Sequence, residues 1–435
     1  SPDRAAPFPR HAGGAEPAYG SSTGSRVLPI AEVTMSLRPM SDIPMRPDSG
    51  SAWPGGGGLV GGVGPVTVIG AGPAGLACAI ALARAGRQVV VREWHNRVAS
   101  RFHGDFQGLE NWSDERDVLD ELRQSGIEAS FDYQGVSQVT VLDDRRRSYR
   151  ICGARPLYYL VRRGAADGTL DTALLQQAVA AGAEVRFGDR ADQADGLVVL
   201  AAGPRVADAI AAGYVFETDM QDGCWAVLDD RLAPLGYAYL LVHGGRGTVA
   251  SCMFAGFKQQ AEHVERTVAY FCEIAGLTMR APRPFGGFAN FRLPRTAVQG
   301  SHPVVGEQAG FQDAFAGFGM RYAMRSGVLA ARSILEGIDY PTLWRRELLP
   351  LLRVGVVNRF MFNVLGRPGR RFLLSRIVAS DADTALRRLY SPTLINRLLF
   401  PLARFRFRAP LRDRSCDHID CHCVWCRCHN DLATA

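Results

Sequence analysis

The sequence predicts an α/β fold in which a parallel sheet flanked by helices is assembled from separate stretches of the chain. Three stretches carry this prediction: residues 66–93, 195–203 and 302–334. Each contains a short apolar run typical of a buried parallel strand, and the first and third also contain a glycine-rich turn followed by an alanine-rich helix. The chain has 435 residues, 47% of them hydrophobic, so it is long enough for two or three domains.

The first stretch runs in the order strand, glycine-rich turn, helix, strand and acidic residue. We expect strands at 66–69 and 88–92 and a helix at 76–85. This order is the complete fingerprint of a Rossmann-type dinucleotide-binding unit. In such a unit the helix N-terminus binds the pyrophosphate and the acidic residue binds the adenosine ribose. The predicted cofactor-binding residues here are Gly70, Gly72, Pro73, Ala74, Gly75 and Glu93.

A second glycine-rich region distinguishes a flavin from a nicotinamide cofactor. An expected strand at 302–305 is followed by Gly306 and Glu307, and then by the turn Gly317-Phe-Gly319-Met320, which opens the third helix. Over roughly residues 65–340 the chain here resembles the FAD-dependent oxidoreductases grouped around geranylgeranyl reductase, a branch of the glutathione-reductase and para-hydroxybenzoate-hydroxylase type of fold.

The resemblance implies FAD as the cofactor and gives the second region its roles. Glu307 stands where this group usually has Asp, and it would bond the flavin ribityl chain. The helix that begins at Met320 would point its positive end at the flavin pyrimidine edge, where reduced flavin carries negative charge. The loop 101–105 takes the place where the family packs against the isoalloxazine or guards access to it, and Arg101 is added to the cofactor-binding residues.

We expect a discontinuous domain organisation. Residues 1–64 are rich in Gly, Pro, Ser and Ala and are predicted to be a disordered extension. The FAD-binding domain takes 65–110, 155–205 and 295–338, and an inserted mixed β-sheet domain for the substrate takes 111–154 and 206–294. A basic region of several short helices at 339–412 and a Cys/His-rich tail at 413–435 follow.

The motifs leave the reaction open, because the flavin itself supplies the electron chemistry. The resemblance favours a reductase or dehydrogenase of an isoprenoid or other lipid-like substrate, working by hydride transfer at flavin N5. A monooxygenase of an aromatic or quinone substrate is one alternative, and a flavoprotein that exchanges electrons with a redox protein is another. A halogenase is disfavoured, since the sequence has no Trp-x-Trp-x-Ile-Pro segment.

The electron donor and the catalytic side chains are also open. The sequence has no second dinucleotide fingerprint, so electrons would come from transiently bound NAD(P)H, from a redox protein or from the substrate. A hydride transfer needs a proton donor or acceptor at the neighbouring carbon. The candidates, chosen by position only and each more often structural, are Tyr237, Tyr239, His243, His103 and Asp105.

Positive charge is concentrated near the C-terminus. Residues 341–415 contain sixteen Arg and four acidic residues, whereas the whole chain is formally +7. Arginines interleaved with Leu and Phe suit an anionic membrane surface, although a solvated Arg-rich face explains them equally well. No nucleic-acid recognition motif accompanies the charge. No apolar run approaches the roughly 18 residues of a membrane span, so we expect a cytoplasmic protein with peripheral membrane contact as an open alternative.

Five of the ten cysteines are concentrated in the tail. Thiolates at this density, interleaved with histidines, suit a soft metal, with zinc slightly favoured over an iron–sulfur cluster. The spacing C-x4-C-x-C-x2-C-x-C matches neither common pattern, and a redox-active or disulfide-bonded tail is the alternative. The predicted metal ligands are Cys416, Cys421, Cys423, Cys426 and Cys428.

Overall fold

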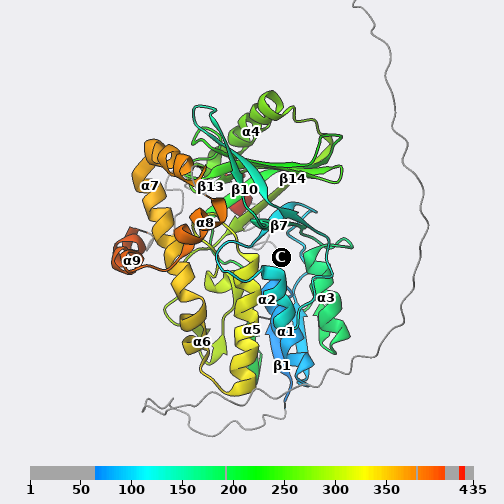
Figure 1. Ribbon diagram of the computed structural model, residues 1–435. Helices are drawn as coiled ribbons and strands as arrows, with labels where there is room; N and C mark the ends of the chain where they lie inside the picture. The colour runs from blue at the N-terminus through cyan, green and yellow to red at the C-terminus, as the bar shows by residue number, and fades with distance from the viewer. Residues whose placement is uncertain (1–63, 192–193, 379–380, 407–420, 427–435) are drawn as a thin grey trace, which may run out of the picture. The chain divides into compact units, whose positions relative to one another are not determined.

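A computed structural model describes residues 64–191, 194–378, 381–406 and 421–426 (Figure 1). The chain divides into two units, 1–58 and 59–435, and every described residue belongs to the second. The expected disordered extension, apart from its last residue, lies outside the described residues, as do the metal candidates Cys416 and Cys428.

A four-stranded parallel sheet forms the centre of the nucleotide-binding region, as the sequence predicts. Its order is β8-β2-β1-β9, and Val66 in β1 is paired with Val89 on one side and Leu197 on the other. Val66 and Val68 are fully buried, because helices cover the sheet and leave no polar face. The strands are β1 (Val66–Ile69), β2 (Val89–Glu93), β8 (Glu184–Phe187) and β9 (Leu197–Leu200).

Two helices that begin at the glycine-rich turns pack directly against each other. They are α1 (Pro73–Arg84) and α5 (Met320–Glu336), and α3 (Leu170–Ala180) also packs on α1. A Cβ on Gly327 of α5 would lie 2.0 Å from the Ala74 carbonyl oxygen, so the two backbones touch. Figure 1 shows α1 and α5 side by side below the mixed sheet.

The strand expected at 302–305 is shorter than predicted. Only β16 (His302–Pro303) forms, paired with β15 (Val298–Gln299). Pro303 has no N–H to donate to a sheet. One parallel bridge joins Val304 to Leu200 of β9, and this bridge brings the following turn, η2 (Gly306–Ala309), to the same sheet edge as Gly70.

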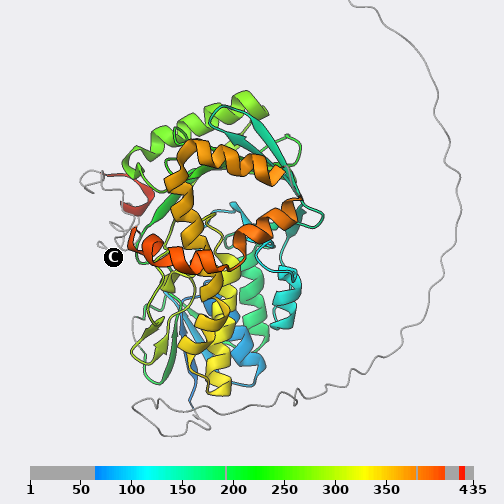
Figure 2. The ribbon, with the colours of Figure 1, turned by 60° about the vertical axis from the view of Figure 1, so that its left-hand side comes forward.

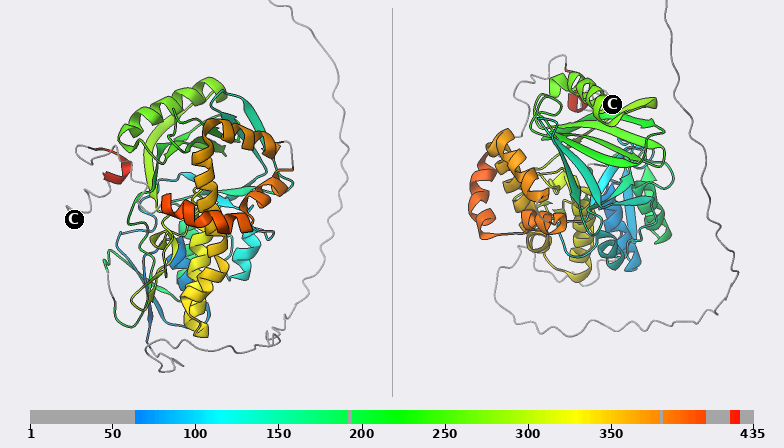
Figure 3. Two further views of the ribbon diagram at one scale, coloured as in Figure 1. Left: turned by 90° about the vertical axis from the view of Figure 1, so that its left-hand side faces the viewer. Right: turned by 45° about the horizontal axis from the view of Figure 1, so that its top comes forward.

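A seven-stranded mixed sheet forms the second layer, in the order β14-β10-β13-β12-β11-β5-β6. Strands β12 and β13 form an antiparallel hairpin within it. Helix α4 (Gln260–Ala275), preceded by η1 (Phe257–Gln259), covers one face with Val264 and Phe271 (Figure 3). The strands are β5 (Gln138–Asp143), β6 (Ser148–Cys152), β10 (Ala209–Glu217), β11 (Gly223–Leu228), β12 (Tyr237–His243), β13 (Arg246–Met253) and β14 (Arg280–Ala289).

A small antiparallel sheet corrects one detail of the prediction. Strand β4 (Tyr133–Val136), which falls in the stretch assigned to the substrate sheet, pairs with β7 (Tyr158–Arg162), and β7 pairs with β3 (Phe106–Glu110). Only Ser137 separates β4 from β5, so the chain passes straight from one sheet into the next. Helix α2 (Val118–Gln124) lies between β3 and β4 in the chain and is capped by Asp117.

The expected C-terminal helices are present, although one is longer than predicted. They are α6 (Tyr340–Glu347), α7 (Leu349–Val378), α8 (Ala382–Tyr390) and α9 (Leu394–Arg406). Helix α7 bends at Gly366, whose φ of 55° and ψ of −159° are not helical, just before Pro368. Figure 2 shows the bent α7 with α8 and α9 returning beside its first half. Among the described helices none is by itself long and apolar enough to cross a membrane; α6 and α7, which meet at 53°, pass that test only as a pair.

Candidate functional site

A cavity of about 1040 Å³ opens where the carboxyl ends of the parallel strands face the mixed sheet. Gly70 after β1, Glu93 at the end of β2 and Ala201 after β9 all line it. Ligands of parallel α/β sheets bind at this edge. Ordinary ligand pockets measure about 300–1,000 Å³, so this cavity is large enough for a cofactor and a substrate together.

The glycines of the first glycine-rich turn serve different purposes: close packing within the turn requires two of them, and the third leaves open space in the cavity. Gly70 has a φ of +109°, and a Cβ there would lie 2.3 Å from the Ala201 carbonyl oxygen. A Cβ on Gly72 would meet no described protein atom within 4 Å, and Gly72 lines the cavity. Pro73 and Ala74 line it too. Gly75 does not, and a Cβ there would lie 2.0 Å from the Gly70 carbonyl oxygen, so close packing within the turn requires glycine at this position.

Glu93 is held at the rim of the cavity by its own neighbourhood. Its carboxylate accepts hydrogen bonds from the backbone N–H of Ala71 at 2.8 Å and of His95 at 3.0 Å. Burial raises the pKa of Glu93, but the hydrogen bonds from His95 and Ala71 lower it by more than burial raises it. The pKa of Glu93 therefore lies below its ordinary value. The carboxylate therefore stays ionised and is able to accept hydroxyl hydrogen bonds.

The structure brings together Arg101 and Glu307, two predicted cofactor residues that are 206 positions apart. Arg101 Nη2 lies 2.5 Å from Glu307 Oε2, and both residues line the cavity. The other terminal nitrogen, Arg101 Nη1, is buried and has no hydrogen-bond partner among the described residues. A buried donor without a partner is costly, so this atom marks a position that a ligand acceptor would satisfy.

The second glycine-rich turn also faces the cavity, with Gly306, Gly317, Gly319 and Met320 in its wall. Asp313 fixes the shape of the loop by accepting the backbone N–H of Ala316 at 2.8 Å and of Phe315 at 3.0 Å. It also accepts the Tyr390 hydroxyl of α8 at 2.8 Å. We did not predict Asp313, although an Asp placed before a Gly-rich turn is a recognised loop signal.

A polar network that we did not predict, apart from Asp105, lies in the cavity wall. Arg163 forms a bidentate ion pair with Asp171, with both N–O distances at 2.8 Å, and its guanidinium lies 4.0 Å from the centre of the Phe102 ring. Arg163 also donates to Gln107 at 3.2 Å, and Gln107 donates to Asp105 at 2.7 Å. Burial raises the pKa of Asp105 despite these contacts.

The five catalytic candidates fall into two groups. Tyr237, Tyr239 and Asp105 line the cavity. His103 and His243 are not among its lining residues: the His103 side chain is exposed, and His243 Nδ1 lies 2.6 Å from Asp222 at a hairpin end. Burial raises the pKa of Tyr237 and of Tyr239 well above 10, so both hold their protons at neutral pH.

The rest of the cavity wall is largely apolar and comes from the mixed sheet, the second glycine-rich loop and the C-terminal helices. Strand residues meet side chains of α7 and α8 across it. The wall includes Val139, Val141, Ile151, Leu241, Phe315, Phe318, Leu373, Leu374, Ile377, Leu386 and Leu389. One cation interrupts this surface, Arg359, whose guanidinium donates to the Leu235 and Ala314 carbonyl oxygens at 2.8 Å.

Comparisons with known proteins agree with this geometry. Residues 64–202 match the family model described as FAD binding domain, and no curated protein matches the chain. A geranylgeranyl bacteriochlorophyll reductase-like protein of Thermoplasma acidophilum has 16% identity and a TM-score of 0.60, with 79% of this chain and 96% of that chain covered.

Two further solved structures with other chemistries share the fold. The flavin-dependent brominase Bmp2 has 15% identity and a TM-score of 0.57, with 79% of this chain and 98% of that chain covered. The p-nitrophenol 4-monooxygenase PnpA of Pseudomonas putida has 14% identity and a TM-score of 0.50, with 78% and 97% covered. Residues 64–202 therefore match the FAD binding domain model, and the chain shares its fold with these flavin-dependent proteins.

Proposed function

We propose that this protein is an FAD-dependent reductase or dehydrogenase of an isoprenoid or other lipid-like substrate. The observation that carries the proposal is the largely apolar part of the cavity wall, which includes residues of the mixed sheet and of α7 and α8. Bound FAD would supply hydride exchange at N5. The chain's own residues would then bind the substrate, exclude water and move one proton.

The cofactor-facing residues suit FAD in size and charge. Gly72 and the free N–H groups of the α1 N-terminus would hold the pyrophosphate, and the ionised Glu93 would hold the adenosine ribose. Arg101 and Glu307 would meet the ribityl chain, which offers hydroxyls both to the carboxylate and to the buried Nη1 atom. The N-terminus of α5 at Met320 would stabilise negative charge on the flavin ring.

The apolar wall supports a hydrocarbon substrate over a polar one. Burying a methylene group in such a wall contributes about 0.8 kcal/mol, so binding strengthens with every added carbon that fits. A small aromatic acid would bring a charge into these apolar surroundings. Leu373, Leu374 and Ile377 reach the cavity from the second half of α7, beyond its bend at Gly366.

The proton for the reaction has a candidate source in Tyr239. Its side chain lines the cavity, and burial keeps it protonated at neutral pH. We therefore assign Tyr239 as the proton donor. Asp105, which also lines the cavity, is held by Gln107. The Tyr237 hydroxyl already donates to the Ala316 carbonyl oxygen at 2.6 Å, so Tyr237 is assigned to loop packing.

Helix α9 supports contact with a lipid surface from which such a substrate would enter. Five large apolar side chains on it are more than half exposed, and Arg397 and Arg404 lie among them. An exposed apolar helix face with basic residues suits an anionic bilayer. The exposed residues are Leu394, Ile395, Leu398, Leu402 and Phe405.

The proposal is tested by a single-turnover experiment without oxygen. The FAD-loaded protein is reduced with dithionite, excess reductant is removed, and a polyprenyl substrate is added while flavin absorbance is followed. We expect flavin reoxidation and a product heavier by two hydrogens, with the hydride from the flavin and the proton from the protein. A saturated chain of equal length is the control and should leave the flavin reduced. Reoxidation that requires oxygen and adds an oxygen atom to the substrate would instead make the protein a monooxygenase.

A further inference from the structure

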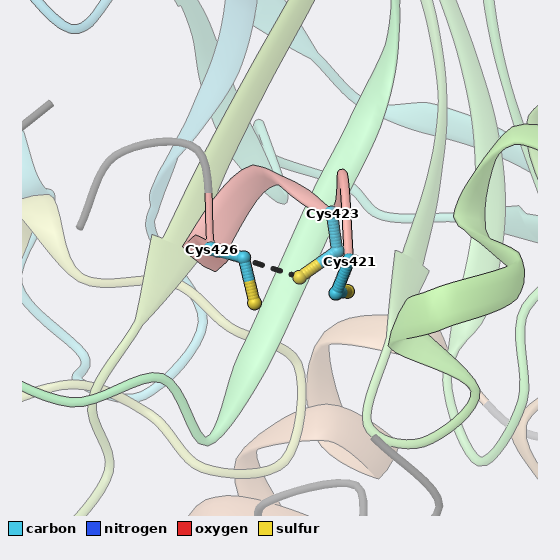
Figure 4. A group of neighbouring side chains, drawn as sticks. All are labelled: Cys421, Cys423 and Cys426. Carbon is cyan, nitrogen blue, oxygen red and sulfur yellow. Dashed lines mark hydrogen bonds between the residues drawn. The ribbon is translucent and has the colours of Figure 1, made fainter. Parts of the chain in front are cut away.

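We propose that Cys421, Cys423 and Cys426 form a binding site for a soft divalent cation, with Zn²⁺ as the ion that fits best. The three sulfur atoms lie within 4.8 Å of one another, and all three side chains are buried. Figure 4 shows the side chains on one short turn, with the Cys426 contact to Cys423 drawn between them. None of the three is part of a disulfide.

The spacing of the sulfurs is close to that of a metal site. A Zn–S bond of about 2.3 Å in tetrahedral geometry places two sulfurs about 3.8 Å apart. Contraction by about 1 Å or less from the observed limit of 4.8 Å would therefore let all three bind one ion. A disulfide would need two sulfurs at about 2.05 Å and would leave the third thiol buried beside it.

The turn is fixed from outside by a side chain of α4. Gln260 accepts the backbone N–H of Val424 at 2.9 Å and donates to the His422 carbonyl oxygen at 3.4 Å. The backbone N–H of Cys426 donates to the Cys423 sulfur at 3.5 Å, an interaction that favours the thiolate over the thiol. The sulfurs are thus held together before any ion arrives, which lowers the ordering cost of binding.

Burial of the three sulfurs suits a cation site, because a divalent cation neutralises the thiolates that bind it. Three protein ligands leave the fourth tetrahedral position to water, as in zinc sites with an exchangeable ligand. The His422 side chain is exposed and is not assigned as a ligand.

The site lies against β14, whose neighbouring residues line the flavin cavity. The ring centres of Trp425 and Phe288 are 4.9 Å apart, and Phe288 is also in the cavity wall. A Cβ on Gly286 would lie 2.4 Å from a Val424 methyl group, so only glycine lets the turn approach this closely. The proposed ion is therefore separate from the cofactor cavity but rests on the same strand.

The test uses the full chain with FAD bound, reduced and freed of metal without oxygen. Co²⁺ is titrated as a spectroscopic probe, and Zn²⁺ is then added in competition. We expect thiolate-to-cobalt charge-transfer absorption that saturates at one ion per chain and is abolished by Zn²⁺. Replacing the cluster with serine (Cys421→Ser, Cys423→Ser, Cys426→Ser) should remove that equivalent, and Cys423→Ser alone should weaken binding at least tenfold.

Exposed cysteines provide the matched control. The pair Cys152→Ser and Cys272→Ser should bind Co²⁺ as the unchanged protein does, since both side chains are exposed and far from the turn in sequence. Flavin absorbance reports whether each variant has folded. Absence of Co²⁺ binding in the full chain would overturn the proposal. Cobalt absorption that is unchanged in the serine triple variant would also overturn it, as would a disulfide within the cluster in protein kept under reducing conditions.

Discussion

Replacing Gly72 with valine should weaken cofactor binding without destabilising the fold. A side chain at Gly72 would meet no described protein atom within 4 Å, and the backbone φ of −79° and ψ of 175° suit any residue. The valine therefore adds no strain and projects into the cavity, where it would displace the pyrophosphate from the α1 N-terminus. Hydrogen bonds to a charged group contribute about 1.5–3 kcal/mol each. Losing two of them costs about 3–6 kcal/mol, which is at least a hundredfold in Kd.

The assay compares FAD binding with thermal stability. Apoprotein of the Gly72→Val variant is titrated with FAD by fluorescence quenching, and its unfolding temperature is measured by circular dichroism. We expect an unfolding temperature of the apoprotein close to that of the unchanged chain and a loss of FAD affinity. The matched control is Gly75→Ala, whose Cβ would lie 2.0 Å from the Gly70 carbonyl oxygen and should destabilise the apoprotein itself. Full FAD affinity in Gly72→Val would refute the position assigned to the pyrophosphate.

Three further predictions concern charge and surface. Arg101→Met removes the ion-pair partner of the Glu307 carboxylate, which is 18% exposed, and should weaken FAD binding about tenfold. The control Arg266→Met removes an arginine from the exposed pair with Glu262 and should leave the FAD titration unchanged. Because the folded pKa of Glu93 is depressed, its contribution to stability is present above its ordinary value of 4.5 and is lost as pH falls below it. Thermal melts of Glu93→Gln should therefore depend less on pH in the acid range, and an unchanged dependence would count against the assignment. The double variant Leu398→Asp, Phe405→Asp should no longer sediment with anionic vesicles, because Leu398 is 79% exposed on α9. The control Leu335→Asp, at an exposed residue of α5, should sediment as the unchanged protein does. Equal sedimentation of the unchanged protein and both variants would exclude α9 as the contact.

The parts of the fold that the sequence predicts are those whose signals are local. The strand, turn, helix and strand at 66–93 follow one another without interruption, so composition and spacing are sufficient to place them. The hairpin of β12 and β13 is equally local. Strand β4 is different, because the sequence around it does not indicate which of two neighbouring sheets it joins. In the structure it pairs with β7 and so belongs to the small sheet.

The candidate site is less predictable, since its contacts join distant segments. Glu307 and Arg101 each stand out in the sequence, but nothing in either segment shows that the two side chains meet. The same holds for Arg163 and Asp171, which come from the end of one strand and the first turn of the next helix. His243 is a candidate by its position in the sequence only, and the fold places it beside Asp222 instead of in the cavity wall.

The packing of α1 on α5 has a consequence for how the protein is made on the ribosome. Val66 pairs with Leu197 in the parallel sheet, and Ala74 packs against Gly327 of α5. Both partners are synthesised more than a hundred residues later. A nascent chain that ends before Gly306 contains the whole first fingerprint but lacks Glu307, Gly319 and Met320 of the cavity wall. Pairings this distant in sequence slow folding and leave apolar surface exposed in the meantime. A cofactor bound in this cavity would therefore have a complete site only after synthesis has passed α5, which would make cofactor insertion a late step.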